Sequence, residues 1–241
     1  MISTDIPVPG SALAIGAHPD DIEFGAGATL AKWADAGCRV SLLICTDGSK
    51  GTWDVEADTA QLVATRQEEQ RVAATQLGAI GEVVFMGSVD GELRNGPVER
   101  TEVATCIRRI RPDVILGHDP WKRYRLHPDH RHAGFLTIDA IVAARDPHFL
   151  PELDLAHHRP VELLLFEAEE IDHVETVAGY DRAKLAALES HRSQFESTMN
   201  VLGDDAGQLE AFRKQERDRL VAHGDLIDVD MGEGFKRITE L

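Results

Sequence analysis

The stretch SALAIGAHPDD, residues 11–21, decides the fold prediction. Its first part, residues 11–16, is a short, mostly apolar run, as expected for a buried strand. A polar turn containing His18, Asp20 and Asp21 follows, and an apolar helical face then spans residues 25–36. A strand, a turn and a helix in this order are the first half of a βαβ unit.

The same alternation continues along the chain. Further strands are predicted at residues 39–46, 82–86, 113–117, 161–166 and 173–177, and further helices at 59–77, 97–110, 129–144, 181–191 and 207–222. We therefore expect an α/β fold with a mostly parallel sheet and helices on both faces. A length of 241 residues suits one domain over residues 1–241, with residues 1–10 as a lead-in.

Composition excludes several classes of protein. With 42 acidic and 25 basic residues, the formal net charge of −17 disfavours duplex nucleic acid and anionic membranes as partners. No apolar run approaches the 18 residues of a membrane span. The three cysteines lack C-x-x-C spacing, which argues against a cysteine zinc site or a disulfide framework. Because residues 1–10 do not resemble a signal peptide, we expect a cytoplasmic protein.

Two His-Pro-Asp motifs carry the chemistry. The first, at residues 18–21, follows the strand 11–16; the second, at residues 127–130, closes the loop after the strand 113–117. In the usual strand order 3-2-1-4-5, these two strands are neighbours at the point where the order reverses. Ligands of open α/β sheets bind there, so the two motifs should meet.

Their residue types indicate a metal site. His18 and Asp21, three residues apart, share one side of a helical turn, and one histidine of the second motif would complete a two-histidine, one-carboxylate set. Such a set suits catalytic zinc, which acidifies a water molecule, although it also serves Fe(II) oxygenases. Asp20, Asp129 and the other histidine suit a general base, an orienting group and a general acid. For either motif taken alone, the alternative to a metal site is an exposed turn, because Pro and Asp are typical turn residues.

A dinucleotide-binding loop is the competing interpretation of Gly25-Ala26-Gly27. Leu30 stands where the third glycine of that motif belongs, and Asp20, Asp21 and Glu23 would repel a pyrophosphate. We therefore do not expect dinucleotide binding.

Together the motifs resemble the PIG-L (LmbE-like) family of zinc-dependent N-deacetylases, which has a Rossmann-like fold. Further likeness lies in Thr46-Asp47-Gly48, in Arg66-x-x-Glu69 before Leu77-Gly78, in Lys184, in His191-x-Ser193-Gln194 and in Gly232-Glu233-Gly234-Phe235. The resemblance implies His18, Asp21 and His130 as metal ligands and Asp20 as the general base. It also implies His127 as the acid and oxyanion donor, oriented by Asp129, and Arg66, Asp90 and Tyr124 as substrate-binding residues.

The resulting hypothesis is a metal-dependent hydrolase that removes an acetyl group from an N-acylated amino sugar or a related small amide. Zinc is the expected metal, with Fe(II), Co(II) and Mn(II) as alternatives. The alternatives are a hydrolase of another small amide or ester, and a non-catalytic metal-binding or nucleotide-binding module. A homo-oligomer is compatible with the sequence.

Other residues receive weaker expectations. Trp53 could stack on a sugar or pack in its loop, and His191 is expected to be a packed or surface residue. Arg108, Arg109 and Arg111 are expected to form a solvated helix end, since cations suit a helix C-terminus.

Overall fold

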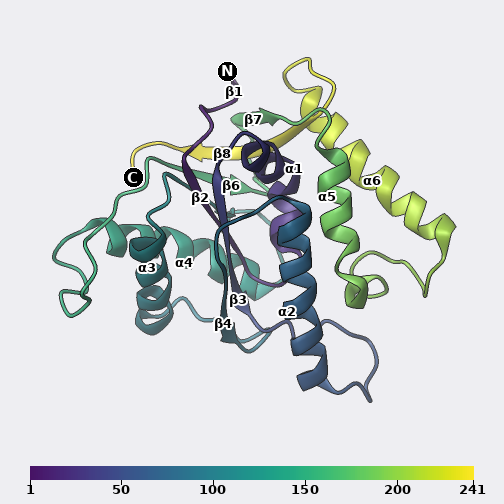
Figure 1. Cartoon of the computed structure of the whole chain (residues 1–241), viewed down its shortest axis with the longest axis horizontal. Helices are drawn as coiled ribbons and strands as arrows, with labels where there is room; N and C mark the ends of the chain where they lie inside the picture. The colour runs from purple at the N-terminus through teal and green to yellow at the C-terminus, as the bar shows by residue number, and fades with distance from the viewer.

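The computed structural model describes residues 1–241 and contains one eight-stranded sheet (Figure 1). The strand order is β1-β7-β8-β6-β5-β2-β3-β4. The strands are β1 (Ser3–Thr4), β2 (Ser11–Gly16), β3 (Arg39–Thr46), β4 (Val83–Ser88), β5 (Val114–His118), β6 (Glu162–Phe166), β7 (His173–Thr176) and β8 (Gly232–Ile238). The helices are α1 (Asp21–Asp35), α2 (Thr59–Gln76), α3 (Pro97–Ile110), α4 (Pro128–Arg145), α5 (Asp181–Glu189) and α6 (Ala206–Gly224), with a 3-10 turn at Arg192–Gln194. None of these helices is both long and apolar enough to span a membrane.

Five consecutive strands at one end of the sheet confirm the predicted order. β4, β3, β2, β5 and β6 are parallel neighbours, so β2 and β5 lie side by side and end at the same edge. Alternating residues of β3 face opposite sides of the sheet. Leu42 and Ile44 pack in the core on the side of α1 and α2, whereas Leu43 and Cys45 pack in the core on the side of α3 and α4. The single α/β domain with helices on both faces is thereby confirmed (Figure 1).

Two strands were not predicted. β8 runs antiparallel between β6 and β7, which makes the sheet mixed. The sequence Gly232–Ile238 does not indicate a strand, because glycine and charged residues interrupt its apolar positions. The expected lead-in of residues 1–10 contains β1, which pairs with β7.

The first helix begins earlier than predicted. It starts at Asp21, so Gly25 and Gly27 lie inside the helix and not in a loop. A side chain at Gly25 would collide with the ring of Phe166, and one at Gly27 would press on Lys184. These glycines therefore allow α1 to pack closely.

The expectation that Arg108 lies in a solvated helix end is wrong. Its guanidinium is buried and donates hydrogen bonds of 2.8–3.1 Å to the carbonyl oxygens of Ala143, Ala144, Asp146 and Phe149. Arg108 therefore satisfies the carbonyls at the end of α4, which otherwise have no helical partner.

Candidate active site

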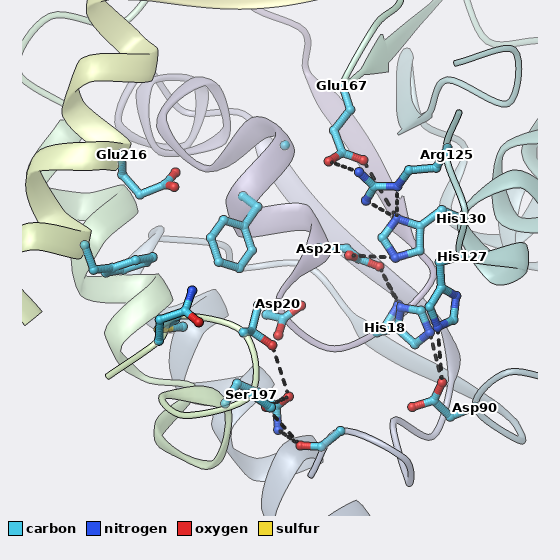
Figure 2. Close-up of a pocket in the computed structure, with 18 of the residues that line it drawn as sticks. His18, Asp20, Asp21, Asp90, Arg125, His127, His130, Glu167, Ser197 and Glu216 are labelled. Carbon is cyan, nitrogen blue, oxygen red and sulfur yellow. Dashed lines mark hydrogen bonds and ion pairs between the residues drawn. The ribbon is translucent and has the colours of Figure 1, made fainter. Parts of the chain in front are cut away.

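The two His-Pro-Asp motifs meet, as predicted, at the carboxyl ends of β2 and β5. They lie in a cavity of about 780 Å³. His18, Asp20 and Asp21 come from the turn between β2 and α1, and His127 and His130 come from the first turn of α4 and the residue before it (Figure 2). This confirms that residues about a hundred positions apart form one cluster.

The turn between β2 and α1 is tightly held. Asp20 has φ of 101°, in the left-handed region that residues with a side chain rarely adopt. Arg66 Nη2 donates to Pro19 O at 2.6 Å and to Asp20 Oδ2 at 3.4 Å. The backbone N–H of Asp20 donates to Gln70 Oε1 at 3.1 Å. Two side chains of α2 therefore hold the backbone of this turn, and one of them, Arg66, also contacts the Asp20 carboxylate.

Asp21 lies between the two histidines with which it was predicted to bind a metal. Its Oδ2 is 3.2 Å from His18 Nδ1, and its Oδ1 is 3.4 Å from His130 Nε2. His18 Nε2 lies 3.2 Å from both Asp90 Oδ1 and Asp129 Oδ2. The histidines and carboxylates are thus in direct contact with one another.

His118, the last residue of β5, belongs to the cluster but was not predicted. Its Nε2 lies 3.3 Å from Asp21 Oδ2, and its Nδ1 lies 3.3 Å from Glu167 Oε2. The signal in the sequence was its position, since it directly follows the predicted strand 113–117 at the edge where ligands bind.

The donor set fits a transition metal. Three groups of side chains place their ligand atoms within 4.8 Å of one another: His18, His127 and His130; His18, Asp90, His127 and Asp129; and Asp21, His118 and His130. Imidazole nitrogens with carboxylate oxygens are the donors that zinc prefers. Both nitrogens of His118 already have partners, because Ala17 N–H donates to Nε2 at 3.3 Å and Glu167 faces Nδ1. His118 nevertheless lies close enough to Asp21 and His130 to be a further candidate ligand.

The electrostatics of the cluster favour a cation. Burial opposes protonation of His18, but its hydrogen bonds with Asp129, Asp21 and Asp90 outweigh this effect and raise its pKa well above 6.5. Burial would raise the pKa of Asp21, but the neighbouring His130 and His118 lower it well below 3.8. A positive charge at this place is thus stabilised, whether a proton or a metal ion supplies it.

Burial lowers the pKa values of His127 and His130 below 6.5, so both are neutral imidazoles near pH 7. The backbone N–H of Asp129 donates to His127 Nδ1 at 3.3 Å. The proton of neutral His127 is therefore on Nε2. Arg125 donates to His130 Nδ1 and to Glu167 Oε1, which fixes the His130 ring (Figure 2).

Asp20 has the electrostatics of a general base. Burial is the largest cause that raises its pKa, to about 6; Arg66 opposes the rise and Asp21 adds to it. A carboxylate of this pKa is ionised at neutral pH and still accepts a proton readily, as general-base catalysis requires.

Of the remaining predicted site residues, some line the cavity and others do not. Arg66 and Asp90 line the cavity, and Asp90 Oδ2 accepts a hydrogen bond of 3.1 Å from the Lys50 N–H. Tyr124 is 85% exposed and is not among the residues that line the cavity. The Asp129 carboxylate contacts His18 and accepts hydrogen bonds from the N–H groups of Gly91 and Leu93, so it is the Asp129 backbone that touches His127.

Two other residues also have defined positions. Trp53 lines the cavity while remaining 75% exposed, so its ring is available at the mouth. His191 is fully buried, with its Nε2 3.6 Å from Glu23 Oε2, as expected for a packed histidine.

The sequence profile of the PIG-L family, described as GlcNAc-PI de-N-acetylase, matches residues 13–141, more than half of the chain. The chain belongs to the PIG-L family. It is therefore a deacetylase, a hydrolase that acts on an amide bond. The matched segment contains both His-Pro-Asp motifs.

Individual PIG-L relatives agree with this assignment. Diacetylchitobiose deacetylase of Thermococcus kodakarensis is 37% identical over 197 residues, which cover 76% of this chain and 69% of the relative. The 1D-myo-inositol 2-acetamido-2-deoxy-alpha-D-glucopyranoside deacetylase of Streptomyces scabiei is 27% identical over 78% of this chain and 64% of its own length. The structure of N,N'-diacetylchitobiose deacetylase from Pyrococcus horikoshii superposes with a TM-score of 0.86 at 29% identity, covering 96% of this chain and 84% of that one.

Proposed function

We propose that this PIG-L deacetylase removes the acetyl group from the nitrogen of an N-acetylated amino sugar. The observation that carries the proposal is the placement of Asp20 and His127 beside His18, Asp21 and His130 in one cavity. A module that only binds a metal would not need a buried base held by Arg66 and Gln70. The relatives named for acetamido sugars support the substrate class.

We propose His18, Asp21 and His130 as the ligands of a zinc ion. When bound, zinc supplies a Lewis acid that polarises the amide carbonyl and acidifies a water molecule. Iron(II), cobalt(II) and manganese(II) are the alternatives for this donor set, and the metal content of the purified protein distinguishes them.

The chain's own residues would divide the proton transfers. The Asp20 carboxylate accepts the proton of the attacking water, and its left-handed backbone keeps it beside the ligands. His127 presents its Nε2–H toward the cavity, where it can donate to the carbonyl oxygen as negative charge develops. Asp20, once protonated, is then available to donate to the leaving amine.

The pocket should favour a neutral, hydroxyl-rich substrate. Asp20, Asp21 and Asp90 line the cavity and would repel a polyanion, while Arg66 and Trp53 offer a donor and an aromatic face. We also propose a cytoplasmic location, which agrees with the three unpaired cysteines, Cys38, Cys45 and Cys106.

The test compares Asp20→Asn and His127→Ala with wild type, using zinc-loaded protein and N-acetylglucosamine or N,N'-diacetylchitobiose as substrate. Released amine and bound metal are measured together. Asp20→Asn should keep its metal while kcat falls about 10²–10⁴-fold, because the amide cannot accept the proton. In His127→Ala, kcat should fall about 10²–10³-fold while the metal stays bound.

Glu68→Gln, an exposed carboxylate-to-amide change on α2, is the matched control and should retain activity. Wild-type protein that cleaves phenyl acetate but no acetamido sugar would be a hydrolase of another class. Protein that binds metal and turns over none of these compounds would be a binding module.

A further inference from the structure

The motif His191-x-Ser193-Gln194 has no part in the proposed reaction, although its histidine is buried close to the turn that carries Asp20. The motif begins at the end of α5, which packs against α1 and α2 (Figure 1). Ser193 donates its backbone N–H to Glu69 Oε1 at 2.8 Å and its hydroxyl group to Glu69 Oε2 at 2.6 Å. The 3-10 turn that contains the motif is thereby held on α2.

The side chain of His191 is enclosed by protein and has no hydrogen-bond partner. It is 0% exposed, and neither of its ring nitrogens forms a hydrogen bond. Its Nε2 lies 3.6 Å from Oε2 of Glu23, which is also fully buried and also lacks a hydrogen bond. Buried polar groups without partners are unfavourable, and a closer approach of roughly half an ångström would join these two atoms in a normal hydrogen bond. Each of the two groups can therefore satisfy the other.

Glu23 connects His191 to the proposed general base. Its other oxygen, Oε1, accepts a hydrogen bond of 2.6 Å from Gln70 Nε2. Gln70 is fully buried as well, and its Oε1 accepts a hydrogen bond of 3.1 Å from the backbone N–H of Asp20. Side chains from the end of α5, from α1 and from α2 thus form one buried series of contacts. We call His191, Glu23, Gln70 and Asp20 the His191 chain.

The His191 chain has a defined direction. A glutamine amide can present either its oxygen or its NH2 group to a neighbour. The Glu23 carboxylate accepts from the amide and the Asp20 N–H donates to it, so the two together select one orientation of Gln70. Asp20, with φ of 101°, keeps its left-handed backbone only while such contacts enforce it. A displacement of Glu23 should therefore reach the Asp20 backbone through Gln70.

We propose that His191 is a positioning residue for Asp20, acting through Glu23 and Gln70 to keep the turn, and with it the carboxylate, within reach of the attacking water. This inference rests on the proposed function, because it takes Asp20 as the general base. His191 is not among the residues that line the cavity, so it does not contact the substrate. Because catalysis is sensitive to small errors in placement, loss of His191 should lower kcat and leave KM nearly unchanged.

The test compares His191→Leu with His191→Gln in zinc-loaded full-length protein, with N,N'-diacetylchitobiose as substrate. Leucine removes the donor, so kcat should fall about 10–100-fold, as is typical when a group that orients the site is lost, while KM changes less than about twofold and the metal stays bound. Glutamine can still donate to Glu23 and should restore most of kcat. An unchanged kcat in His191→Leu, or an equal loss in His191→Gln, would overturn the proposal.

His173→Leu is the matched control. His173 is also 0% exposed and pairs with a buried glutamate, Glu175, at 3.0 Å, but it lies outside the cavity. This variant should lose stability in thermal unfolding and keep its kcat. A fall in kcat equal to that of His191→Leu would mean that the loss follows from destabilisation alone, which would contradict the proposal.

The Asp20→Asn background separates positioning from general damage to the site. In this background His191→Leu should change kcat less than about twofold, because no carboxylate remains to be positioned. Equal losses in both backgrounds would mean that His191 acts on another part of the site, and the proposal would be wrong.

Failure of the proposed function has a separate signature, namely no amine release by wild-type protein. Hydrogen exchange measured by NMR then tests the His191 chain without activity. The Asp20 N–H should exchange about 5–10-fold faster in His191→Leu than in His173→Leu, as expected when one hydrogen bond is weakened. Equal exchange rates would exclude the chain.

Glu23→Gln tests the same chain if His191→Leu does not fold. The new amide can present either its oxygen or its NH2 group to Gln70, so the direction of the chain is lost. The Asp20 N–H should again exchange faster and kcat should fall with the metal retained. No change in either quantity would overturn the proposal.

Discussion

At the scale of single residues, Asp20 combines a strained backbone with a buried carboxylate. A non-glycine residue in such a conformation costs about 1–3 kcal/mol and persists only where its surroundings enforce it. Here Arg66 and Gln70 enforce it, and both come from α2. Arg66 therefore has a role in shaping the β2–α1 turn in addition to any contact with substrate.

His118 and His130 should respond differently to substitution. His130→Ala removes a predicted ligand and should abolish stoichiometric metal binding. His118→Asn removes a partner of Asp21, so it should weaken affinity by about 10–100-fold while about one metal per chain still binds at excess zinc. Chelator competition and elemental analysis measure both quantities. His148→Ala, on an exposed loop, is the control, and complete loss of metal from His118→Asn would make His118 a ligand.

At the scale of elements, close packing of α1 against β6 depends on Gly25. Gly25→Ala should destabilise the protein by about 1–3 kcal/mol, because the added methyl group overlaps the Phe166 ring and α1 must shift. Gly207→Ala, in the first turn of α6, should change the stability much less, because the added methyl group meets only the Asp205 side chain, at 3.3 Å. Thermal and urea unfolding of both variants measure the difference. Equal stabilities would mean that Phe166 moves aside without strain.

Prediction from the sequence succeeded where the apolar pattern was continuous. The strands from β2 to β6 and the bounds of α3 followed from such runs, and the strand order then placed both His-Pro-Asp motifs at one edge. β8 was not predicted because its partner strands are distant in sequence and its own residues mix apolar, charged and glycine positions. The burial of Arg108 and the place of His118 in the cluster were missed for a related reason, since both depend on tertiary contacts that no local pattern encodes.

At the scale of the whole molecule, Glu175 links three parts of the fold. It lies in β7 and accepts hydrogen bonds from Ile6 N–H at 2.8 Å and Trp33 Nε1 at 3.3 Å, and it pairs with Lys32 at 2.5 Å and His173 at 3.0 Å. Burial would raise the pKa of Glu175, but these partners outweigh it and lower the pKa below its ordinary value of 4.5.

This lowered pKa predicts an acid-dependent loss of stability. Because the unfolded chain binds the proton more readily, the contribution of Glu175 is fully present above about pH 4.5 and is lost as pH falls through the folded pKa. Glu175→Gln should therefore show a shallower fall in the free energy of unfolding below pH 4.5. Urea unfolding between pH 7 and pH 3 measures this slope, with Glu68→Gln as the exposed control. Parallel curves for Glu175→Gln and wild type would contradict the prediction.

The position of β8 has a consequence for the order of assembly. The strands β4, β3, β2, β5 and β6 all precede residue 167 in the chain, and each pairs with another of this group. β7 and β1 pair with each other, but they reach the rest of the sheet only through β8, which begins at residue 232. During synthesis, these five strands can therefore form a sheet while the β1–β7 pair still has no neighbouring strand to join. β8 can cover the free edge of β6 only after residues 232–238 have been synthesised. Until then, the unpaired edge of β6 is exposed to incorrect pairing.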